Sequence, residues 1–246
     1  QDAGGLHAGQ GGGEPVIEFK QVSKYFGTVR ALDNFQAQLA SGRVIGLFGP
    51  NGAGKSTSLK MIAGLNRPNR GQVLVDGLNP WMTRDRVAYL PEVDHLYPWM
   101  TVGKAAQFIS TFYSDWDQAK YQDLLNYLNL NEDMKIGKIS KGQRAKVKLL
   151  LTLSRCSPYL LLDEPLSGID LLTREEIINS VIRDYREGEQ TVIISTHEID
   201  EVEGLVDEVI FIQNGKTVLS GNAEDLREEK NMSLVEIMKE VMRSAC

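Results

Sequence analysis

Short apolar runs alternate with longer amphipathic stretches along this chain, a pattern typical of an α/β fold. Continuously apolar runs predict strands of a parallel sheet that is buried on both faces: 43–48, 87–90, 159–163 and 190–195. Further strands are predicted on either side of Gly27, at residues 16–20 and 28–40, and again at residues 71–77. Strands are therefore expected in both halves of the sequence.

The pattern changes over about residues 93–156, where apolar residues recur at helical spacing. Helices are predicted for three stretches with no convincing strand between them: 101–113, 117–130 and 141–156. We therefore expect a helical insertion that divides the sheet-forming halves. In the last of these helices, core spacing predicts a buried stripe of Ala145, Leu149, Leu153 and Cys156.

Composition limits the binding partners and the compartment expected for this fold. A net charge of −6 argues against broad, unspecific binding of nucleic acid. The two cysteines are far apart, so we expect a reducing compartment and no disulfide. No apolar run approaches the ~18 residues that cross a bilayer, so work at a membrane would need another chain. Residues 1–14 are rich in glycine and predict a flexible leader or a remnant of cloning, with a single domain over residues 15–246.

The run GPNGAGKST at residues 49–57 matches G-x-x-x-x-G-K-[ST] and lies between a predicted strand and a predicted helix. In that setting, glycines turn backbone N–H groups toward an oxyanion, and the helix N-terminus adds about half a positive charge. Lys55 is expected to reach the β- and γ-phosphates, and the Ser56 hydroxyl to take one position on Mg²⁺. The residues predicted to bind a nucleoside triphosphate are Gly49, Pro50, Asn51, Gly52, Ala53, Gly54, Lys55, Ser56 and Thr57.

A second motif, YLLLDEP at residues 159–165, joins a buried strand to two acidic residues. Such a strand delivers its carboxylates to the C-terminal edge of the sheet, where α/β proteins place their ligands. Asp163 is expected to hold Mg²⁺, directly or through water. Glu164 is expected to orient or deprotonate an attacking water beside the γ-phosphate. An apolar run that ends in Asp-Glu is a weak signal alone. The phosphate loop in the same chain supports the expected roles of Asp163 and Glu164.

The run ISKGQR at residues 139–144 predicts a helix start with Ser140 as the N-cap. Gly142 leaves the first-turn backbone open, so that a phosphate can approach it. One chain cannot bring two phosphate-binding helix starts to the same γ-phosphate, but a second copy facing the first head to tail can. The residues predicted to serve the nucleotide of the opposite copy are Ser140, Lys141, Gly142 and Gln143.

In their order and spacing, the phosphate loop, the S-x-G-Q helix start and the LLLDEP strand resemble the nucleotide-binding domain of ATP-binding-cassette (ABC) proteins, over about residues 15–246. The usual signature of the family is LSGGQ, and this chain has ISKGQ, with Lys141 at the first glycine. That variant is similar to bacterial ATPase subunits that serve ABC-2-type exporters. The resemblance implies a P-loop NTPase core with a mostly parallel sheet, an N-terminal antiparallel β subdomain and an inserted helical subdomain.

Three further site residues follow from the resemblance. Phe26 looks like the aromatic residue that stacks on adenine, with Tyr25 as the less favoured candidate and burial in the core as the competing explanation. Asp170 ends the SGID run at residues 167–170, which looks like the loop that crosses the dimer interface. His197, at the end of TVIISTH, looks like the switch histidine at the γ-phosphate.

The chain departs from the family at YLPE, where Glu92 stands in the place of the usual glutamine. That glutamine contacts Mg²⁺ and senses the membrane partner. A carboxylate can also ligate a hard cation, but it adds charge beside a polyphosphate and cannot donate a hydrogen bond as an amide does. Glu92 is therefore expected to join Ser56 and Asp163 at the metal.

The resemblance implies an ATPase subunit of an ABC transporter, of the bacterial ABC-2 exporter type, with Glu164, His197 and Lys55 as catalytic residues and ATP and Mg²⁺ as ligands. Its implied partners are a second nucleotide-binding domain and transmembrane permease subunits, which would hold it at the cytoplasmic face of the cell membrane. No nucleic acid is expected. An importer ATPase is the alternative, followed by a non-transport ABC ATPase of translation or DNA repair.

Aromatic residues concentrate in the helical insertion. Some of them must be core, and the others are candidates to line a groove for a short helix of the membrane subunit. These residues are Tyr97, Trp99, Phe112, Tyr113 and Trp116.

Overall fold

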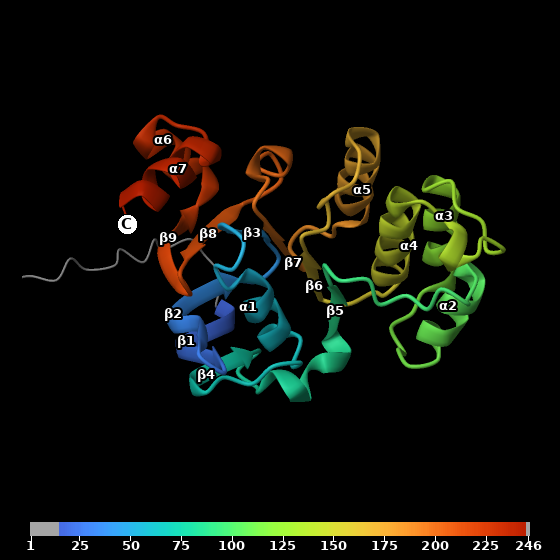
Figure 1. Cartoon of the computed structure of the whole chain (residues 1–246), viewed down its shortest axis with the longest axis horizontal. Helices are drawn as coiled ribbons and strands as arrows, with labels where there is room; N and C mark the ends of the chain where they lie inside the picture. The colour runs from blue at the N-terminus through green and yellow to red at the C-terminus, as the bar shows by residue number, and fades with distance from the viewer. Residues whose placement is uncertain (1–14, 245–246) are drawn as a thin grey trace, which may run out of the picture.

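A six-stranded sheet crosses the middle of the computed structural model, which describes residues 15–244 (Figure 1). The strand order is β5-β6-β7-β3-β8-β9, and all neighbours are parallel except β9, which is antiparallel to β8. The strands are β3 Val44–Phe48, β5 Val87–Leu90, β6 Tyr159–Asp163, β7 Thr191–Thr196, β8 Glu208–Gln213 and β9 Lys216–Asn222. The sequence predicts β3, β5, β6 and β7 to within one residue, whereas β8 and β9 are additional. The expectation for residues 1–14 lies outside the described residues.

A second sheet, with the order β2-β1-β4, is antiparallel throughout, as the resemblance implies. It consists of β1 Pro15–Phe26, β2 Val29–Ala40 and β4 Arg70–Val75. The first two strands meet in a tight turn at Gly27, whose φ of 58° suits glycine. β1 extends past its predicted end at residue 20, because register shifts such as the one between Phe19 and Val22 interrupt its alternation without ending the pairing.

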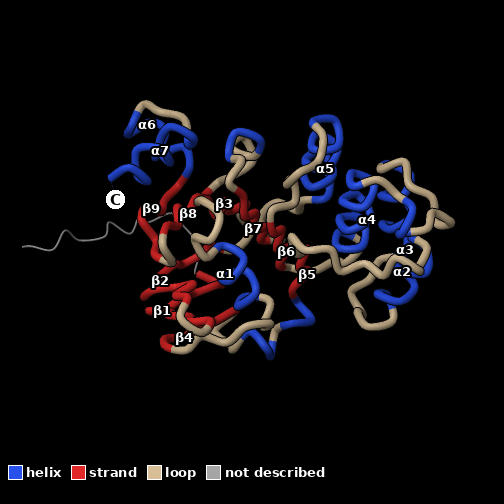
Figure 2. Tube along the Cα trace, in the orientation of Figure 1, coloured by secondary structure: helices blue, strands red, loops and turns tan. Residues whose placement is uncertain are grey.

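Three helices follow one another between β5 and β6 and lie together on one side of the molecule (Figures 1 and 2). They are α2 Val102–Ser110, α3 Gln118–Tyr127 and α4 Lys141–Leu153. The prediction that Cys156 continues the buried stripe of the last helix is wrong. The helix has already ended at Leu153, and Cys156 is exposed.

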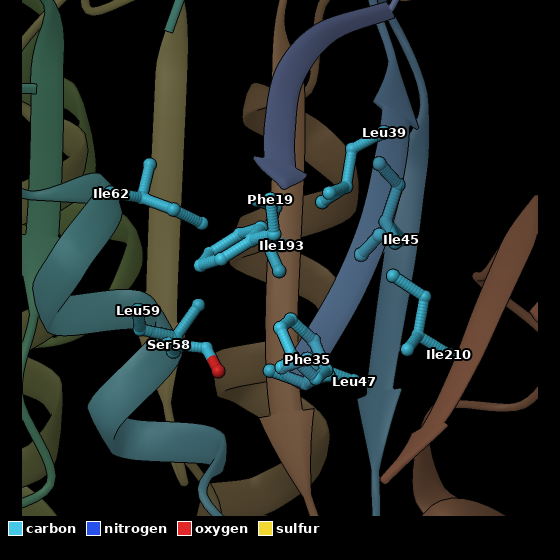
Figure 3. A pocket seen from close by; sticks show the side chains of 11 residues that line it. Phe19, Phe35, Leu39, Ile45, Leu47, Ser58, Leu59, Ile62, Ile193 and Ile210 are labelled. Carbon is cyan, nitrogen blue, oxygen red and sulfur yellow. The ribbon is translucent and has the colours of Figure 1, made fainter. Parts of the chain in front are cut away.

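The remaining helices of the described residues are α1 Lys55–Ile62, α5 Leu171–Asp184, α6 Ala223–Lys230 and α7 Leu234–Ser244, with short 3₁₀ turns η1 Pro80–Met82, η2 Arg84–Arg86, η3 Ile136–Lys138 and η4 Ile199–Glu201. The six-stranded sheet separates two apolar cores. Successive strand residues face opposite sides, so Leu161 belongs to one core and Leu162 to the other. In the core that contains Leu161, α1 packs against both sheets and leaves a gap of only about 10 Å³ (Figure 3).

A buried arginine joins the helical insertion to the sheet. The Arg155 guanidinium donates two hydrogen bonds of 2.9 Å to the Asp115 carboxylate, and it also donates to the carbonyl oxygens of Val87 and Asp85, both at 2.6 Å. The Tyr113 ring lies 3.7 Å from the guanidinium carbon. Because Val87 begins β5, these contacts connect the helices directly to the edge of the sheet.

Candidate active site

The phosphate loop, residues 49–57, runs from the C-terminal end of β3 into the first turn of α1, at the edge where the parallel strands β6 and β7 also end. Two of its positions require glycine. A Cβ on Gly49 would lie 2.2 Å from the carbonyl oxygen of Ile212, and one on Gly54 would lie 2.6 Å from that of Ala31. Within the loop Pro50, Asn51 and Gly52 are exposed, whereas Ala53 is buried and Ser56 and Thr57 are half-buried. The loop therefore presents the N-terminus of α1 at this edge.

Lys55 is buried at the start of α1, with 5% of its side chain exposed. Its ammonium donates hydrogen bonds to the carbonyl oxygens of Gly49 at 2.7 Å and Pro50 at 3.2 Å. It also lies 3.0 Å from Oε1 of Glu164, close enough for an ion pair but without hydrogen-bond geometry. A buried charge is costly without a partner, and these contacts hold the ammonium over the loop.

Asp163 ends β6 with 1% of its surface exposed. Oδ1 accepts hydrogen bonds from Ser56 Oγ at 2.9 Å and Ser195 Oγ at 2.7 Å, and Oδ2 accepts one from the Tyr89 hydroxyl at 2.9 Å. Burial and the adjacent Asp163 charge raise the pKa of Tyr89, which keeps the phenol protonated as a donor. The carboxylate is thus held by residues from three other segments, α1, β5 and β7.

Glu164 adopts a left-handed backbone with φ of 46°, which is uncommon for residues other than glycine, asparagine and aspartate. Its N–H donates to the carbonyl oxygen of Ser195 at 3.0 Å and to Ser195 Oγ at 3.2 Å, which holds this turn. Oε2 lies 2.9 Å from His197 Nδ1. The turn directs the side chain between Lys55 and His197, in a conformation of the kind that clusters at functional sites.

Sequence reasoning missed Ser195 and Tyr89 in this cluster. Ser195 is completely buried and serves both acidic residues, through Asp163 Oδ1 and the Glu164 N–H. A serine within the apolar run at residues 190–195 is the signal that could have identified it. Tyr89 carries no such signal, because tyrosine is common in strands.

The predicted phosphate-binding start of α4 lies apart from the loop at α1, with β5 and β6 between them (Figure 1). Ser140 caps the helix, accepting from the Gln143 N–H at 3.1 Å, while the Gln143 side chain accepts from the Ser140 N–H at 3.0 Å. This capping box confirms Ser140 as the N-cap. The structure does not bring residues 140–143 to Lys55 within one chain.

The start of α4 packs instead against the loop of residues 167–170. A Cβ on Gly142 would lie 2.9 Å from Thr173 Oγ1, and one on Gly168 would lie 2.2 Å from the exposed Lys141 ammonium. The Asp170 carboxylate caps α5, accepting from the Thr173 N–H at 3.1 Å and its hydroxyl at 2.8 Å. These bonds lower the pKa of Asp170.

Two predicted residues lie at the margins of the site. Phe26 is 48% exposed at the end of β1, with the Lys24 ammonium 5.0 Å from its ring centre, so it is not a core residue. Glu92 is exposed just after β5, and its carbonyl oxygen accepts a hydrogen bond of 2.9 Å from Lys148 Nζ.

The residues present fit Mg²⁺. In the part of the chain that the structure describes, no three or more His, Cys, Asp and Glu side chains form a metal cage. Mg²⁺ does not need one, because it usually keeps several waters and binds one or two carboxylates together with phosphates. The Ser56 hydroxyl and the Asp163 carboxylate, 2.9 Å apart beside the phosphate loop, supply the oxygen donors that this mode requires.

Known proteins resemble this chain in sequence and in fold. The family profile described as ABC transporter matches residues 32–167. An ABC transporter ATP-binding protein of Methanocaldococcus jannaschii is 32% identical over 87% of this chain and 80% of its own length. The chain belongs to the ABC transporter family. A probable multidrug ABC transporter ATP-binding protein of Escherichia coli K12 is 34% identical over 91% of this chain, which spans 40% of that relative. A solved ATP-binding subunit of an ABC transporter superposes with a TM-score of 0.81 at 27% identity, over 92% of this chain and 99% of that one.

Membership in the ABC family makes this chain an ATP-binding cassette that hydrolyses ATP. ABC ATPase domains dimerise and work with transmembrane subunits. Within residues 15–244, no helix has the length and apolar character needed to cross a membrane.

Proposed function

We propose that this ABC ATPase drives an exporter of the bacterial ABC-2 type, with Glu164 activating the water that attacks ATP. The observation that carries the proposal is a cluster of three charged or titratable side chains at the C-terminal edge of the sheet. The Glu164 carboxylate lies 3.0 Å from the Lys55 ammonium and 2.9 Å from the His197 ring. A carboxylate held between a phosphate-loop lysine and a histidine is placed to accept a proton from a water at the γ-phosphate.

The other residues bind and orient the nucleotide. The N–H groups of residues 49–57 and the N-terminus of α1 take up the phosphates. Lys55 exchanges its contacts with the Gly49 and Pro50 carbonyls for phosphate oxygens, and His197 contacts the γ-phosphate. Ser56 and Asp163, with Glu92 nearby, would hold Mg²⁺, which would supply positive charge beside the phosphates. The exposed Phe26 ring stacks on adenine.

Each complete site takes its second half from another copy of the chain, or from a related subunit. The supporting observations are that Ser140, the N-cap of α4, is exposed, and that α4 lies apart from α1 of the same chain (Figure 1). In a head-to-tail dimer, the α4 start of one copy closes over the nucleotide of the other, and residues 167–170 lie along the interface. Lys141 adds a positive charge facing the phosphates.

The proposed direction of transport, export, rests on two sequence features, the ISKGQ run and Glu92. A Nod factor export ATP-binding protein of Burkholderia lata is 31% identical over 87% of this chain, and a probable sulfate/thiosulfate import ATP-binding protein of Chlorella vulgaris is 29% identical over 89%. The ISKGQ signature and Glu92 favour export. Copurification of the membrane subunits, followed by substrate flux measured in proteoliposomes with ATP on one side, decides between them. Inward flux would overturn the exporter assignment.

The membrane subunit is proposed to dock on aromatic residues of the helical insertion. Among the five predicted candidates, Tyr113 packs on Arg155 and Trp116 on Tyr121, and both serve the fold. Tyr97 and Trp99 are exposed, with ring centres 5.7 Å apart. They continue through Phe108 to the exposed Phe112, with ring-centre distances of 6.3 and 5.1 Å. Exposed aromatic side chains of this kind suit a short apolar helix.

The catalytic proposal is tested with Glu164→Gln. The amide keeps the shape but loses the base, so turnover should fall at least about 10²-fold. ATP binding should persist and an ATP-bound dimer should accumulate, measured by a fluorescent ATP analogue and by size-exclusion chromatography. Glu189→Gln, which makes the same change at a 73% exposed side chain, is the control and should behave as the parent. Parental turnover by Glu164→Gln would remove Glu164 from catalysis.

A further inference from the structure

Tyr89 lies on β5, the strand just before Glu92. Its hydroxyl donates a hydrogen bond to Asp163, the last residue of the neighbouring strand β6. β5 and β6 are parallel, and Tyr89 pairs with Leu161, which places its hydroxyl 2.9 Å from Asp163 Oδ2. The two serine hydroxyls both bond to the other oxygen, Oδ1. Tyr89 is therefore the sole donor to Oδ2 among the hydrogen bonds of the described residues, and its hydroxyl fixes the plane of the carboxylate.

Lys148 contacts the backbone just after the end of β5. It lies on α4 and is only 9% exposed, and its ammonium donates hydrogen bonds to the carbonyl oxygens of Pro91 and Glu92. Burial lowers the pKa of Lys148, while the charges of Asp94, Asp163 and Glu92 act in the opposite direction. A lysine is costly to bury. Here its hydrogen bonds are directed at the backbone that carries Glu92.

We propose that Tyr89 and Lys148 are positioning residues of the metal site, with Tyr89 orienting the Asp163 carboxylate and Lys148 fixing the backbone of Glu92. This rests on the proposed function, in which both acidic residues serve Mg²⁺. The reason is chemical. Mg²⁺ demands near-ideal octahedral geometry. The affinity of the site for Mg²⁺ therefore falls when a carboxylate rotates or the backbone that carries it moves, even if the charge is intact. The Lys148 charge also offsets the extra negative charge of Glu92 beside the phosphates.

The Tyr89 part is tested with Tyr89→Phe, which removes one hydroxyl. The control is Tyr159→Phe, because Tyr159 lies at the opposite end of β6 and its hydroxyl bonds to the Asp76 carboxylate. Binding of Mn²⁺ to the protein with a non-hydrolysable ATP analogue is followed by electron paramagnetic resonance. Tyr89→Phe should weaken Mn²⁺ binding about tenfold, as expected for a lost hydrogen bond to a charged group. Binding of the analogue in EDTA should stay at the parental level.

The Lys148 part is tested with a double-mutant cycle. Lys148→Met and Glu92→Ala should each weaken Mn²⁺ binding. The double variant should bind no more weakly than Glu92→Ala, because Lys148 acts through Glu92. Thermal melts establish that each variant is folded.

The outcomes distinguish a failure of the positioning roles from a failure of the proposed metal site. Equal Mn²⁺ affinities for Tyr89→Phe and Tyr159→Phe would overturn the role of Tyr89, and additive losses in the cycle would overturn that of Lys148. If the parent protein bound no Mn²⁺ with the nucleotide analogue, the proposed metal site would itself be wrong, and this inference would fall with it.

Discussion

The starts of α1 and α4 are both assigned to phosphate, yet their surroundings differ. At α1, Lys55 is buried and contacts carbonyls of its own loop and the Glu164 carboxylate just after β6. At α4, Ser140 and Gln143 satisfy each other, and Ser140 is exposed. The first helix start is held by residues from several strands, whereas the cap of the second is completed by residues of its own first turn. A substitution at the start of α1 should therefore affect the nucleotide site of its own chain. A substitution at the start of α4 should have an effect only when two chains form a dimer.

Among the substitutions that test this contrast, Ser140→Arg should have the largest effect. A cation at a helix N-terminus is unfavourable, and the larger side chain would obstruct the opposite nucleotide. Turnover should fall about 10²-fold, comparable to the loss of a transition-state donor, while a fluorescent ATP analogue binds the monomer as tightly as before.

Ser233→Arg is the control for this change. Ser233 makes an equivalent cap at the start of α7, where its N–H donates to Glu236 at 2.9 Å and its Oγ accepts from the Glu236 N–H at 3.3 Å. Its turnover should remain near the parental rate. Weaker monomer binding by Ser140→Arg would show that α4 acts within its own chain, and the contrast between the two helix starts would disappear.

An intermediate effect is expected from Ser195→Ala on the α1 side. The substitution removes a donor to Asp163 and an acceptor for the Glu164 N–H. Turnover should fall about tenfold, corresponding to 1–2 kcal/mol for a lost buried hydrogen bond. Stopped-flow phosphate release measures it.

The matched control is Ser180→Ala. Ser180 is equally buried, but its hydroxyl donates at 2.7 Å to the Glu176 carbonyl within α5. Equal turnover for the two alanine variants would mean that Ser195 contributes to folding alone.

The smallest effect is expected from Glu92→Gln. The amide oxygen can replace one carboxylate oxygen, so ATPase activity should change by no more than about twofold, the scale of a surface substitution. Glu92→Ala should instead raise the Mg²⁺ concentration needed for half-maximal activity and weaken stimulation by the membrane subunits. Glu229→Ala, at an exposed position on α6, is the control. Superimposable Mg²⁺ titrations for all four proteins would remove Glu92 from the site.

Continuous apolar runs made much of the sheet predictable. Residues 87–90 and 159–163 coincide with β5 and β6, because strands buried on both faces need apolar side chains at every position. β9 escaped prediction because it is an edge strand, exposed or half-buried along its length, without a clear apolar face. Cys156 was misassigned because helical spacing carried on past the end of α4.

The candidate site was predictable where a motif specifies both residue type and spacing, as at Lys55 and Asp163. The left-handed turn at Glu164 depends on the hydrogen bonds that its N–H donates to Ser195, 31 residues later (195 − 164). The hydroxyl of Tyr89 and the ammonium of Lys148 acquire their targets only when β5, β6 and α4 come together. Such contacts leave no periodic trace in the sequence.

The place of β3 in the sheet has a consequence for how the protein is made. β3 lies between β7 and β8, and its Val44 pairs with Val192, 148 residues later (192 − 44). A ribosome that adds roughly 5–20 residues per second needs on the order of ten seconds to supply both neighbours. During that interval the apolar strand before the phosphate loop has neither of its pairing partners, although α1 can already form. The phosphate loop therefore leaves the ribosome well before it can acquire its final shape, and nascent chains that stop short of β7 should depend on chaperones.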